Sequence, residues 1–282
     1  MSERNIIQVG KLLPMVVRST GLLMCSLSIA ITGLWPNVAN ADGNADLAKE
    51  LSNPIASLIS VPFQFNFDRN IGPNDDGELT TLNIQPVIPF ELNADWNIIS
   101  RTIVPLKWSS DIPSGDGSDF GLGDVVQSFF FSPKKPTSNG WIWGVGPVIV
   151  IPTSSDTRFG LDEWGLGPTG VVLKQSNGWT YGALANHVWD VGGDVDINAT
   201  YLQPFLSYTT PDAWTFTVNT ESTYDWEGEQ WSVPIHASVS KLVRFGQRPV
   251  SLQLGIRHWA ESTPTGPEGT GVRASITFLF PK

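Results

Sequence analysis

The chain has 282 residues, of which 16% are charged, 41% are hydrophobic and 11% are aromatic. Its 27 glycines and 21 prolines disfavour helical bundles and doubly wound enzymes, and its aromatic content with so little charge argues against disorder. A formal net charge of −10 argues against a nucleic-acid binder that tracks phosphates. These features leave an all-β protein, either soluble or embedded in a membrane.

Residues 1–41 have the order of a secretory signal peptide. A leader with three basic residues precedes an apolar run over 21–31, and Ala39-Asn40-Ala41 supplies the small residues of a cleavage site. The apolar run is shorter than the roughly 18–20 residues that a spanning helix needs. We predict cleavage after Ala41, which leaves 241 residues with 14 basic and 26 acidic side chains and no cysteine.

Residues 42–60 form a short N-terminal segment before the first expected strand. One face of a short helix, interrupted by Pro54, would carry the apolar residues Leu47, Leu51, Ile55 and Leu58. Such a segment would plug the lumen of a barrel or lie in the periplasm, and a flexible lead-in is the alternative.

The rest of the chain, residues 61–282, alternates apolar and polar residues with the period of a β-strand. Trp214, Phe216 and Val218, for example, alternate with Thr215 and Thr217. Turn signals separate twelve such segments, each of about 9–13 residues, which is the length that a tilted strand needs to cross a bilayer. We expect strands over 61–69, 80–90, 96–108, 120–131, 141–152, 164–174, 179–189, 197–208, 214–224, 231–243, 250–260 and 270–280.

The connections between these strands alternate in length and charge. One set is mostly short and holds Lys134, Lys135, Arg244 and Arg248. The other set has six connections, which together hold 17 acidic residues, three in each of the first five and two in the last. Their one basic residue is Arg158. Alternate loops of an up-and-down barrel lie at opposite ends, as in outer-membrane proteins. The sequence therefore predicts an acidic mouth that includes Asp75, Asp76, Asp162, Glu163, Asp194, Glu227 and Glu229.

Tryptophans gather at the ends of the expected strands. Aromatic girdles at both rims of a barrel are expected at lipid headgroups, whereas the core of a soluble β-sandwich would not require rings at strand ends. The nine rings in question are Trp96, Trp108, Trp141, Trp164, Trp179, Trp189, Trp214, Trp231 and Trp259. The pattern favours a transmembrane β-barrel over the soluble alternative.

Five prolines conflict with uninterrupted strands, because each removes a hydrogen bond from the ladder and a closed barrel has no edge to hold it. Bulges are expected nearby, or the strand boundaries differ. The prolines are Pro86, Pro105, Pro147, Pro168 and Pro204.

The search for catalytic or metal-binding chemistry finds no convincing site. The run Gly165-Leu166-Gly167-Pro168-Thr169-Gly170 matches a dinucleotide motif by letter but leads into a strand, where the motif needs a helix N-terminus. His187, His236 and His258 lack zinc-ligand spacing. A serine such as Ser238 or Ser240 near His236 would offer a lipase-like triad only if the geometry supplied one. We therefore expect no enzyme, no cofactor and no metal.

Several charged residues lie inside strands on the polar face. A basic side chain facing lipid at the bilayer midplane costs about 2–4 kcal/mol, so these residues should face the lumen. They would either fill a narrow barrel with ion pairs or form a charged constriction that selects solutes. The set is Asp68, Arg101, Lys107, Asp124, Glu221, His236, Arg257 and Arg273.

Several stretches over residues 53–282 resemble Gram-negative outer-membrane transporter-like proteins of the "meta-pathway of phenol degradation" family. The resemblance implies an outer-membrane barrel for small organic solutes, aromatic ones among them, and implies no catalytic residues. The stretches are Asn53-Pro54-Ile55-Ala56 with Ser60-Val61-Pro62-Phe63, Asn83-Ile84-Gln85-Pro86-Val87, Gly121-Leu122-Gly123-Asp124, Gln203-Pro204-Phe205-Leu206-Ser207-Tyr208 and Glu221-Ser222-Thr223-Tyr224-Asp225-Trp226.

The sequence as a whole predicts an exported, antiparallel up-and-down transmembrane β-barrel of twelve strands in the outer membrane. Its expected function is a passive channel for small solutes, in contact with lipid, lipopolysaccharide and the barrel-assembly machinery. The acidic mouth would favour cations or bind divalent ions at the lipopolysaccharide layer. The alternatives are a non-conducting structural or adhesive barrel and an outer-membrane lipid-modifying enzyme.

Overall fold

The computed structural model describes residues 38–281 apart from 114, 116 and 194, so most of the predicted signal peptide lies outside the described residues. One helix precedes fifteen strands. The elements are α1 (Val38–Leu51), β1 (Ile59–Ile71), β2 (Gly77–Ile84), β3 (Val87–Glu91), β4 (Trp96–Ser110), β5 (Ser118–Leu122), β6 (Val125–Pro133), β7 (Trp141–Ile151), β8 (Gly165–Ser176), β9 (Trp179–Asp190), β10 (Asn198–Thr209), β11 (Trp214–Thr220), β12 (Ser222–Asp225), β13 (Gln230–Phe245), β14 (Arg248–Glu261) and β15 (Thr270–Phe280).

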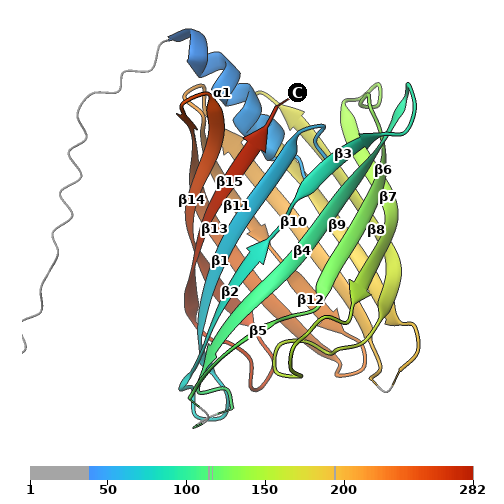
Figure 1. The fold of residues 1–282 in the computed structure, drawn as a ribbon. Coiled ribbons are helices and arrows are strands. Elements are labelled where there is room, and N and C mark those ends of the chain that lie inside the picture. The colour runs from blue at the N-terminus through green and yellow to red at the C-terminus, as the bar shows by residue number, and fades with distance from the viewer. Residues whose placement is uncertain (1–37, 114, 116, 194, 282) are drawn as a thin grey trace, which may run out of the picture. The chain divides into compact units, whose positions relative to one another are not determined.

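The strands form one closed antiparallel barrel (Figure 1). Neighbouring positions around the wall follow the order of the chain, and β1 closes the wall by pairing with β15 in the register Phe63↔Ile276. Three positions around the wall are each filled by two collinear strands, namely β2 with β3, β5 with β6, and β11 with β12. The predicted twelve-stranded up-and-down barrel is therefore confirmed, with breaks inside the segments predicted at 80–90, 120–131 and 214–224.

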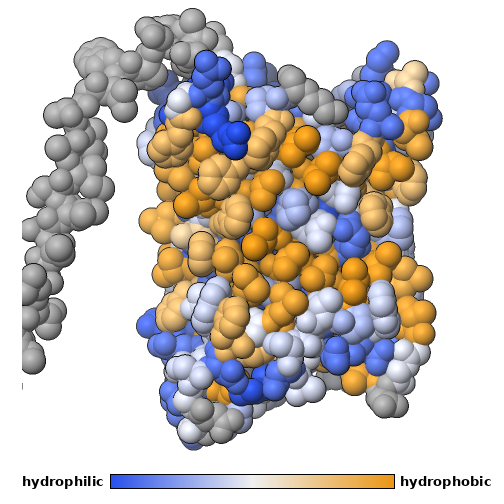
Figure 2. All heavy atoms as spheres, in the orientation of Figure 1, coloured by the Kyte–Doolittle hydropathy of each residue, from blue (hydrophilic) through white to orange (hydrophobic). Residues whose placement is uncertain are grey.

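The alternation seen in the sequence separates the outside of the barrel from its inside. On β15, for example, Val272 and Ile276 are exposed, whereas Arg273 and Ser275 between them are buried. A belt of hydrophobic residues crosses the middle of the visible face, with hydrophilic residues gathered towards both ends (Figure 2). This is the surface expected of a barrel surrounded by lipid.

Four of the five unexpected prolines lie beside interruptions in the ladder. Pro147 and Pro168 face each other across β7 and β8, and the pairing with the outer neighbours β6 and β9 skips these positions. In an antiparallel pair, opposed residues that are not hydrogen-bonded to each other direct their N–H groups towards the strands on the outer sides. The ladders to β6 and β9 are interrupted at Pro147 and Pro168, so the missing proline N–H groups remove no ladder hydrogen bond there. Pro86 lies in the gap between β2 and β3, and Pro204 lies opposite the break between β11 and β12.

Pro105 is accommodated by a bulge in the neighbouring strand. On either side of Pro105, Leu106 pairs with Leu122 of β5 and Ile103 pairs with Val126 of β6. Three residues of the neighbouring chain therefore lie opposite two residues of β4, which is one extra residue. The carbonyl of Pro105 accepts a hydrogen bond from Gly123 N–H at 2.8 Å. A bulge of this kind bends the strand and removes the need for the missing donor.

We call the barrel end with the turns β3–β4, β6–β7, β8–β9, β10–β11 and β13–β14 the short-turn end, and the other the long-loop end. Helix α1 lies at the short-turn end, as does the C-terminus (Figure 1). Ala48 of α1 and Ala56 and Leu58 after it pack on Ala213 and Leu242 of the barrel. Ile55 enters the lumen, where it is 4% exposed. The N-terminal segment therefore packs across the short-turn end of the lumen.

The interior has two chemically different sides. The apolar wall comprises buried side chains of β4 and β6–β9, namely Ile99, Phe130, Val148, Val171, Leu173 and Leu184. The polar wall comprises the inward side chains of β10–β15 and β1, including Ser207, Thr215, His236, Ser251, Arg273 and Ser275. Ile55 packs in the same cluster as Ile99 and Leu173, so the N-terminal segment rests on the apolar wall.

Among the residues that the structure describes, no helix is long and apolar enough to cross a membrane.

Candidate functional site

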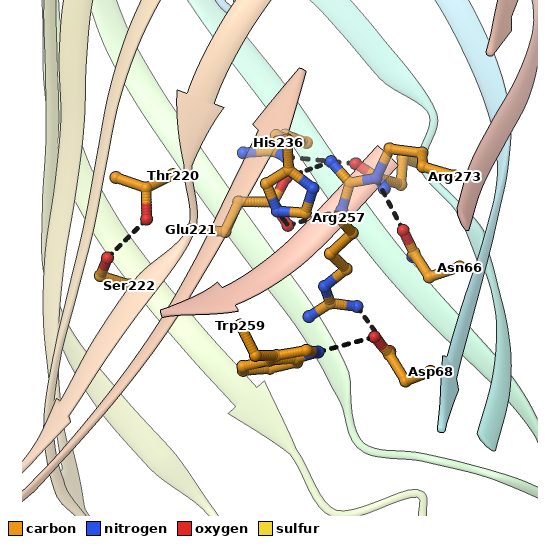
Figure 3. A network of polar contacts seen from close by, with 11 residues as sticks. Asn66, Asp68, Thr220, Glu221, Ser222, His236, Arg257, Trp259 and Arg273 are labelled. Atoms are coloured by element: carbon orange, nitrogen blue, oxygen red, sulfur yellow. Dashed lines mark hydrogen bonds and ion pairs between the residues drawn. The ribbon is translucent and has the colours of Figure 1, made fainter. Parts of the chain in front are cut away.

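The strand register brings charged residues together on the polar wall (Figure 3). Arg273 of β15 pairs with Asn66 of β1, and His236 of β13 pairs with Arg257 of β14. Glu221 joins them from the single residue between β11 and β12. Side chains that are far apart in the sequence thus share one patch because up-and-down pairing places their strands side by side.

Arg273 and Glu221 form a bidentate ion pair. The two guanidinium nitrogens of Arg273 donate to the two carboxylate oxygens of Glu221 at 2.7 and 2.8 Å, and Nε donates to Asn66 Oδ1 at 2.7 Å. The Arg273 side chain is only 6% exposed. A bidentate geometry is the strong form of such a pair, so this arginine holds its carboxylate fixed.

Asp68 and Arg257 form a second ion pair at 2.8 Å. The other carboxylate oxygen of Asp68 accepts a hydrogen bond from the indole of Trp259 at 2.8 Å, and the Arg257 guanidinium lies 4.5 Å from the centre of that ring. Trp259 therefore faces the lumen. The prediction that it belongs to the tryptophan rim is wrong, because strand alternation puts it on the same face as Arg257.

His236 lies beside these pairs but takes no part in a catalytic arrangement. Its ring is 1% exposed, its Nε2 is 3.5 Å from Glu221 Oε2, and neither ring nitrogen has a hydrogen-bond partner among the described residues. The nearby Ser238 hydroxyl instead accepts a hydrogen bond from Gln253. The geometry needed for a triad at His236 is absent from the described part of the chain.

The other two histidines lie on the outer face of the barrel. Nδ1 of His187 is 2.7 Å from the hydroxyl of Thr200, and Nδ1 of His258 is 3.0 Å from that of Thr270. Nε2 of His187 is buried without a partner in the described residues. Neither pair has a third residue that would orient the imidazole as a base.

A cavity of about 250 Å³ lies between the N-terminal segment and the polar wall. Hydroxyl and carboxamide side chains dominate its lining, with apolar contributions from Phe205, Val87 and Leu58. Both Arg273 and Arg101 contribute to it, and Glu221 is the acidic residue among its lining. The polar lining includes Gln64, Gln203, Asn219, Ser240, Ser251 and Ser275.

Arg101 lies on β4 and lines this cavity, but it is not paired with Asp68 or Glu221, the carboxylates that bind Arg257 and Arg273. Its guanidinium donates to Gln85 Oε1 at 3.2 Å. No ion pair found among the described residues includes Arg101, whereas Arg257 and Arg273 each have one. Of the eight residues predicted to face the lumen, four form the two ion pairs and two contact a loop. The other two are Arg101, without a carboxylate, and His236, whose ring nitrogens have no hydrogen-bond partner among the described residues.

Lys107 and Asp124 belong to the long-loop end. Lys107 Nζ donates to the carbonyl of Phe159 at 2.6 Å. The carboxylate of Asp124 accepts four backbone hydrogen bonds, from the N–H groups of residues 153, 154, 161 and 162. Phe159 is 2% exposed. These two charged residues therefore anchor the β7–β8 loop against the barrel mouth.

The acidic residues of the expected mouth lie on loops of the long-loop end. Asp75 and Asp76 lie between β1 and β2, Asp162 and Glu163 between β7 and β8, and Glu227 and Glu229 between β12 and β13. Asp194 lies outside the described residues. In the described part of the chain no group of three or more histidine, cysteine or acidic side chains is arranged to hold a metal ion.

Sequence reasoning singled out charged residues and missed their neutral partners. Three neutral residues bind the charged groups directly, namely Asn66, Gln85 and Trp259. All three lie within segments that the sequence predicts as strands, Trp259 near the end of its segment. The signal that could have found Asn66 is its period-two relation to Asp68. Trp259 stands in the same relation to Arg257.

No protein-family model matches this chain, and no curated protein matches it. Its structure is similar to the COG4313 outer membrane channel from Pseudomonas putida F1, with a TM-score of 0.61 and 15% identity over 79% of this chain and 94% of that chain. It is also similar to outer membrane phospholipase A from Escherichia coli, with a TM-score of 0.51 and 12% identity over 86% of this chain and 98% of that chain. At these identities the likeness establishes a shared barrel fold.

Proposed function

We propose that this chain is an outer-membrane barrel that passes small solutes passively through its lumen. The observation that carries the proposal is a polar cavity enclosed by a closed barrel whose outer face bears an apolar belt. Such a belt is expected where lipid surrounds a barrel, and a polar lumen is expected where water or solutes enter it. The fold shared with a protein described as an outer membrane channel supports the same assignment.

The N-terminal segment limits passage at the short-turn end. Asn97 Nδ2 donates to Ser57 Oγ at 3.0 Å, Gln175 Nε2 donates to Lys49 O at 2.7 Å, and Arg244 donates to Asn44 Oδ1 at 2.8 Å. These contacts hold the segment at three places around the barrel end. Conduction therefore requires a solute small enough to pass beside the segment or a movement of the segment.

Single-channel conductance in a planar bilayer tests the proposal. The protein purified from membranes in detergent is compared with a variant lacking residues 42–58, each checked for folding by circular dichroism. We expect small discrete steps from the full protein and larger steps from the variant. If both folded proteins are silent, the channel assignment is wrong and the non-conducting barrel takes its place, a function that the two central ion pairs also favour.

The acidic loops support a second element of the proposal, namely cation preference or binding of divalent ions at the lipopolysaccharide layer. Replacing Asp75, Asp76, Asp162 and Glu163 by their amides should shift the reversal potential in a salt gradient towards anions. The effect should shrink at high ionic strength, because exposed charges are screened there. An unchanged reversal potential would show that the loops do not control ion selectivity.

A further inference from the structure

The polar wall carries hydrogen-bonding groups that the protein itself does not use. Gln64, Asn219, Ser240, Ser251 and Ser275 face the cavity, and none of their side chains has a hydrogen-bond partner among the described residues. Their polar atoms are accessible from the cavity, because none of these atoms is fully buried without a partner. Polar groups of this kind bind water or a ligand, since burial without a partner would be unfavourable.

Arg101 adds an unneutralised positive charge to the same cavity. Arg273 is neutralised by Glu221, and Arg257 by Asp68. Among the described residues Arg101 donates only to the neutral side-chain carbonyl oxygen of Gln85, which leaves guanidinium donors available to an anion. Arginine binds a carboxylate through two parallel hydrogen bonds, which fixes its orientation as well as its position.

We propose that this cavity binds a small organic monoanion that carries several hydroxyl groups, such as a sugar acid or another hydroxy acid, with its carboxylate on Arg101. The inference rests on the proposed channel function and names the class of solute. It belongs with the version of that proposal in which the acidic loops bind divalent ions, because loops neutralised in this way do not repel an anion. The unpaired hydroxyl and carboxamide groups of the polar wall receive the ligand's hydroxyl groups. The cavity of about 250 Å³ holds on the order of eight water molecules at liquid density. Its volume is small for a ligand-binding pocket, so the ligand must be small as well.

The lining favours a hydroxylated ligand over a plain fatty acid or a neutral sugar. An apolar tail would leave the carboxamides of Gln64 and Asn219 unpaired while displacing their water, which is unfavourable. A neutral sugar would satisfy the wall but leave the Arg101 charge without a partner. The two requirements together select a ligand that has both a carboxylate and hydroxyl groups.

Isothermal titration calorimetry tests the proposal on the detergent-purified protein. D-gluconate is the probe, D-glucose is the control without a carboxylate, and hexanoate is the control without hydroxyl groups. We expect gluconate to bind roughly ten- to hundredfold more tightly than either control, which is the effect of one charged hydrogen-bonded contact. If gluconate binds no better than the controls to the wild-type protein, the proposal is overturned without any variant.

Variants assign the site. Arg101→Gln should weaken gluconate binding roughly ten- to hundredfold and leave glucose unaffected, and Arg101→Lys should weaken it less because the charge remains. Arg69→Gln removes the same charge from an exposed position outside the cavity and should bind gluconate as the wild type does. Equal losses from Arg101→Gln and Arg69→Gln would overturn the assignment to the cavity.

The titration and the conductance measurement separate the two proposals. A protein that conducts but binds gluconate no better than glucose would refute the ligand assignment and leave the channel intact. A protein that binds gluconate through Arg101 but stays silent in a bilayer would support the site while refuting passive conduction.

Discussion

The apolar wall and the polar wall are built from the same alternating strand pattern but serve the lumen differently. On the apolar wall, Phe130, Ile99 and Leu173 are fully buried and Ile55 of the N-terminal segment completes their packing. On the polar wall, the ion pairs adjoin hydroxyl and amide groups that have no partner among the described residues. Packing closes one side of the lumen, and the other side keeps an open, hydrogen-bonding surface.

The difference teaches how a narrow barrel combines rigidity with a site. An apolar interior can be filled by complementary side chains, so that it stabilises the fold without specifying a ligand. A polar interior must supply partners for its carboxylates, and here Asp68 and Glu221 on the polar wall each have an arginine. The predictions below probe this contrast.

The largest expected effect comes from breaking the bidentate pair of the polar wall. Arg273→Met leaves Glu221, whose side chain is 21% exposed, as a largely buried carboxylate without its arginine, which should destabilise the protein by about 3–5 kcal/mol. The measurement is the urea unfolding midpoint of the refolded protein in detergent micelles. The double variant Arg273→Met with Glu221→Gln should recover most of the loss. If the single and double variants unfold alike, the pair is not the origin of the effect.

The next effect concerns the contact between the N-terminal segment and the apolar wall. Ile55→Ala removes a buried side chain and leaves a cavity beside Ile99, which should cost about 2–5 kcal/mol. We expect faster proteolytic cleavage within residues 43–58 and a lower unfolding midpoint. Ile256→Ala, at a position that is 54% exposed on the outer face, is the matched control and should change neither quantity. Equal sensitivity of the two variants would contradict the packing described here.

The contrast recurs at the two ends of the barrel. Packing closes the short-turn end, whereas hydrogen bonds to Asp124 hold the β7–β8 loop at the long-loop end. Asp124→Asn removes an acceptor oxygen and should cost about 1–3 kcal/mol, seen as faster hydrogen exchange at amides 153–162. Asp119→Asn removes an exposed carboxylate that binds Arg158 and should change exchange far less. The same exchange rate in both variants would argue against Asp124 as the anchor.

The smallest effect is a pH dependence at the end of α1. Burial raises the pKa of Glu50 above its ordinary value. Because the folded state disfavours the charged form, the segment is held less tightly above this raised pKa and more tightly as the pH falls through it. Proteolysis of residues 43–58 should therefore slow as the pH falls from neutral towards that pKa. Glu50→Gln should abolish the change, and an unaltered pH profile in the variant would assign it to another group.

The strands were predictable because period-two alternation fixes both their presence and their faces. On β15 the alternation of Val272 with Arg273 already assigns each residue to lipid or lumen. Irregularities near the prolines were expected, but their form was not predictable, since only the register shows that Pro147 and Pro168 lie opposite each other. Pairing partners depend on strand neighbours far apart in the sequence, so the ion pair between Glu221 and Arg273 could not be read from either residue.

The candidate site was predictable only as a set of charged residues that face inward. The sequence did not reveal that Lys107 and Asp124 bind a loop backbone while Arg101 lacks a carboxylate, because these differences depend on the fold of the β7–β8 loop and on distances between strands. Residues 42–60 were open to interpretation as a plug, a periplasmic segment or a flexible lead-in. Their packing across the barrel end depends on the spacing of Ile55 and Leu58 relative to a lumen whose shape the sequence does not give.

The facing prolines of β7 and β8 have a mechanical consequence. This hairpin is continuously paired within itself, yet its attachment to β6 and to β9 is interrupted at the level of Pro147 and Pro168. Gly146 and Gly167 bring the backbones close at the same level, where an added Cβ would lie 1.9 and 1.7 Å from the carbonyl oxygens of Phe129 and His187. The hairpin is thus a panel bounded by two lines of fewer hydrogen bonds. Under lateral pressure from the bilayer, we expect the wall to bend more readily along these two lines than within the hairpin itself, where the ladder is continuous.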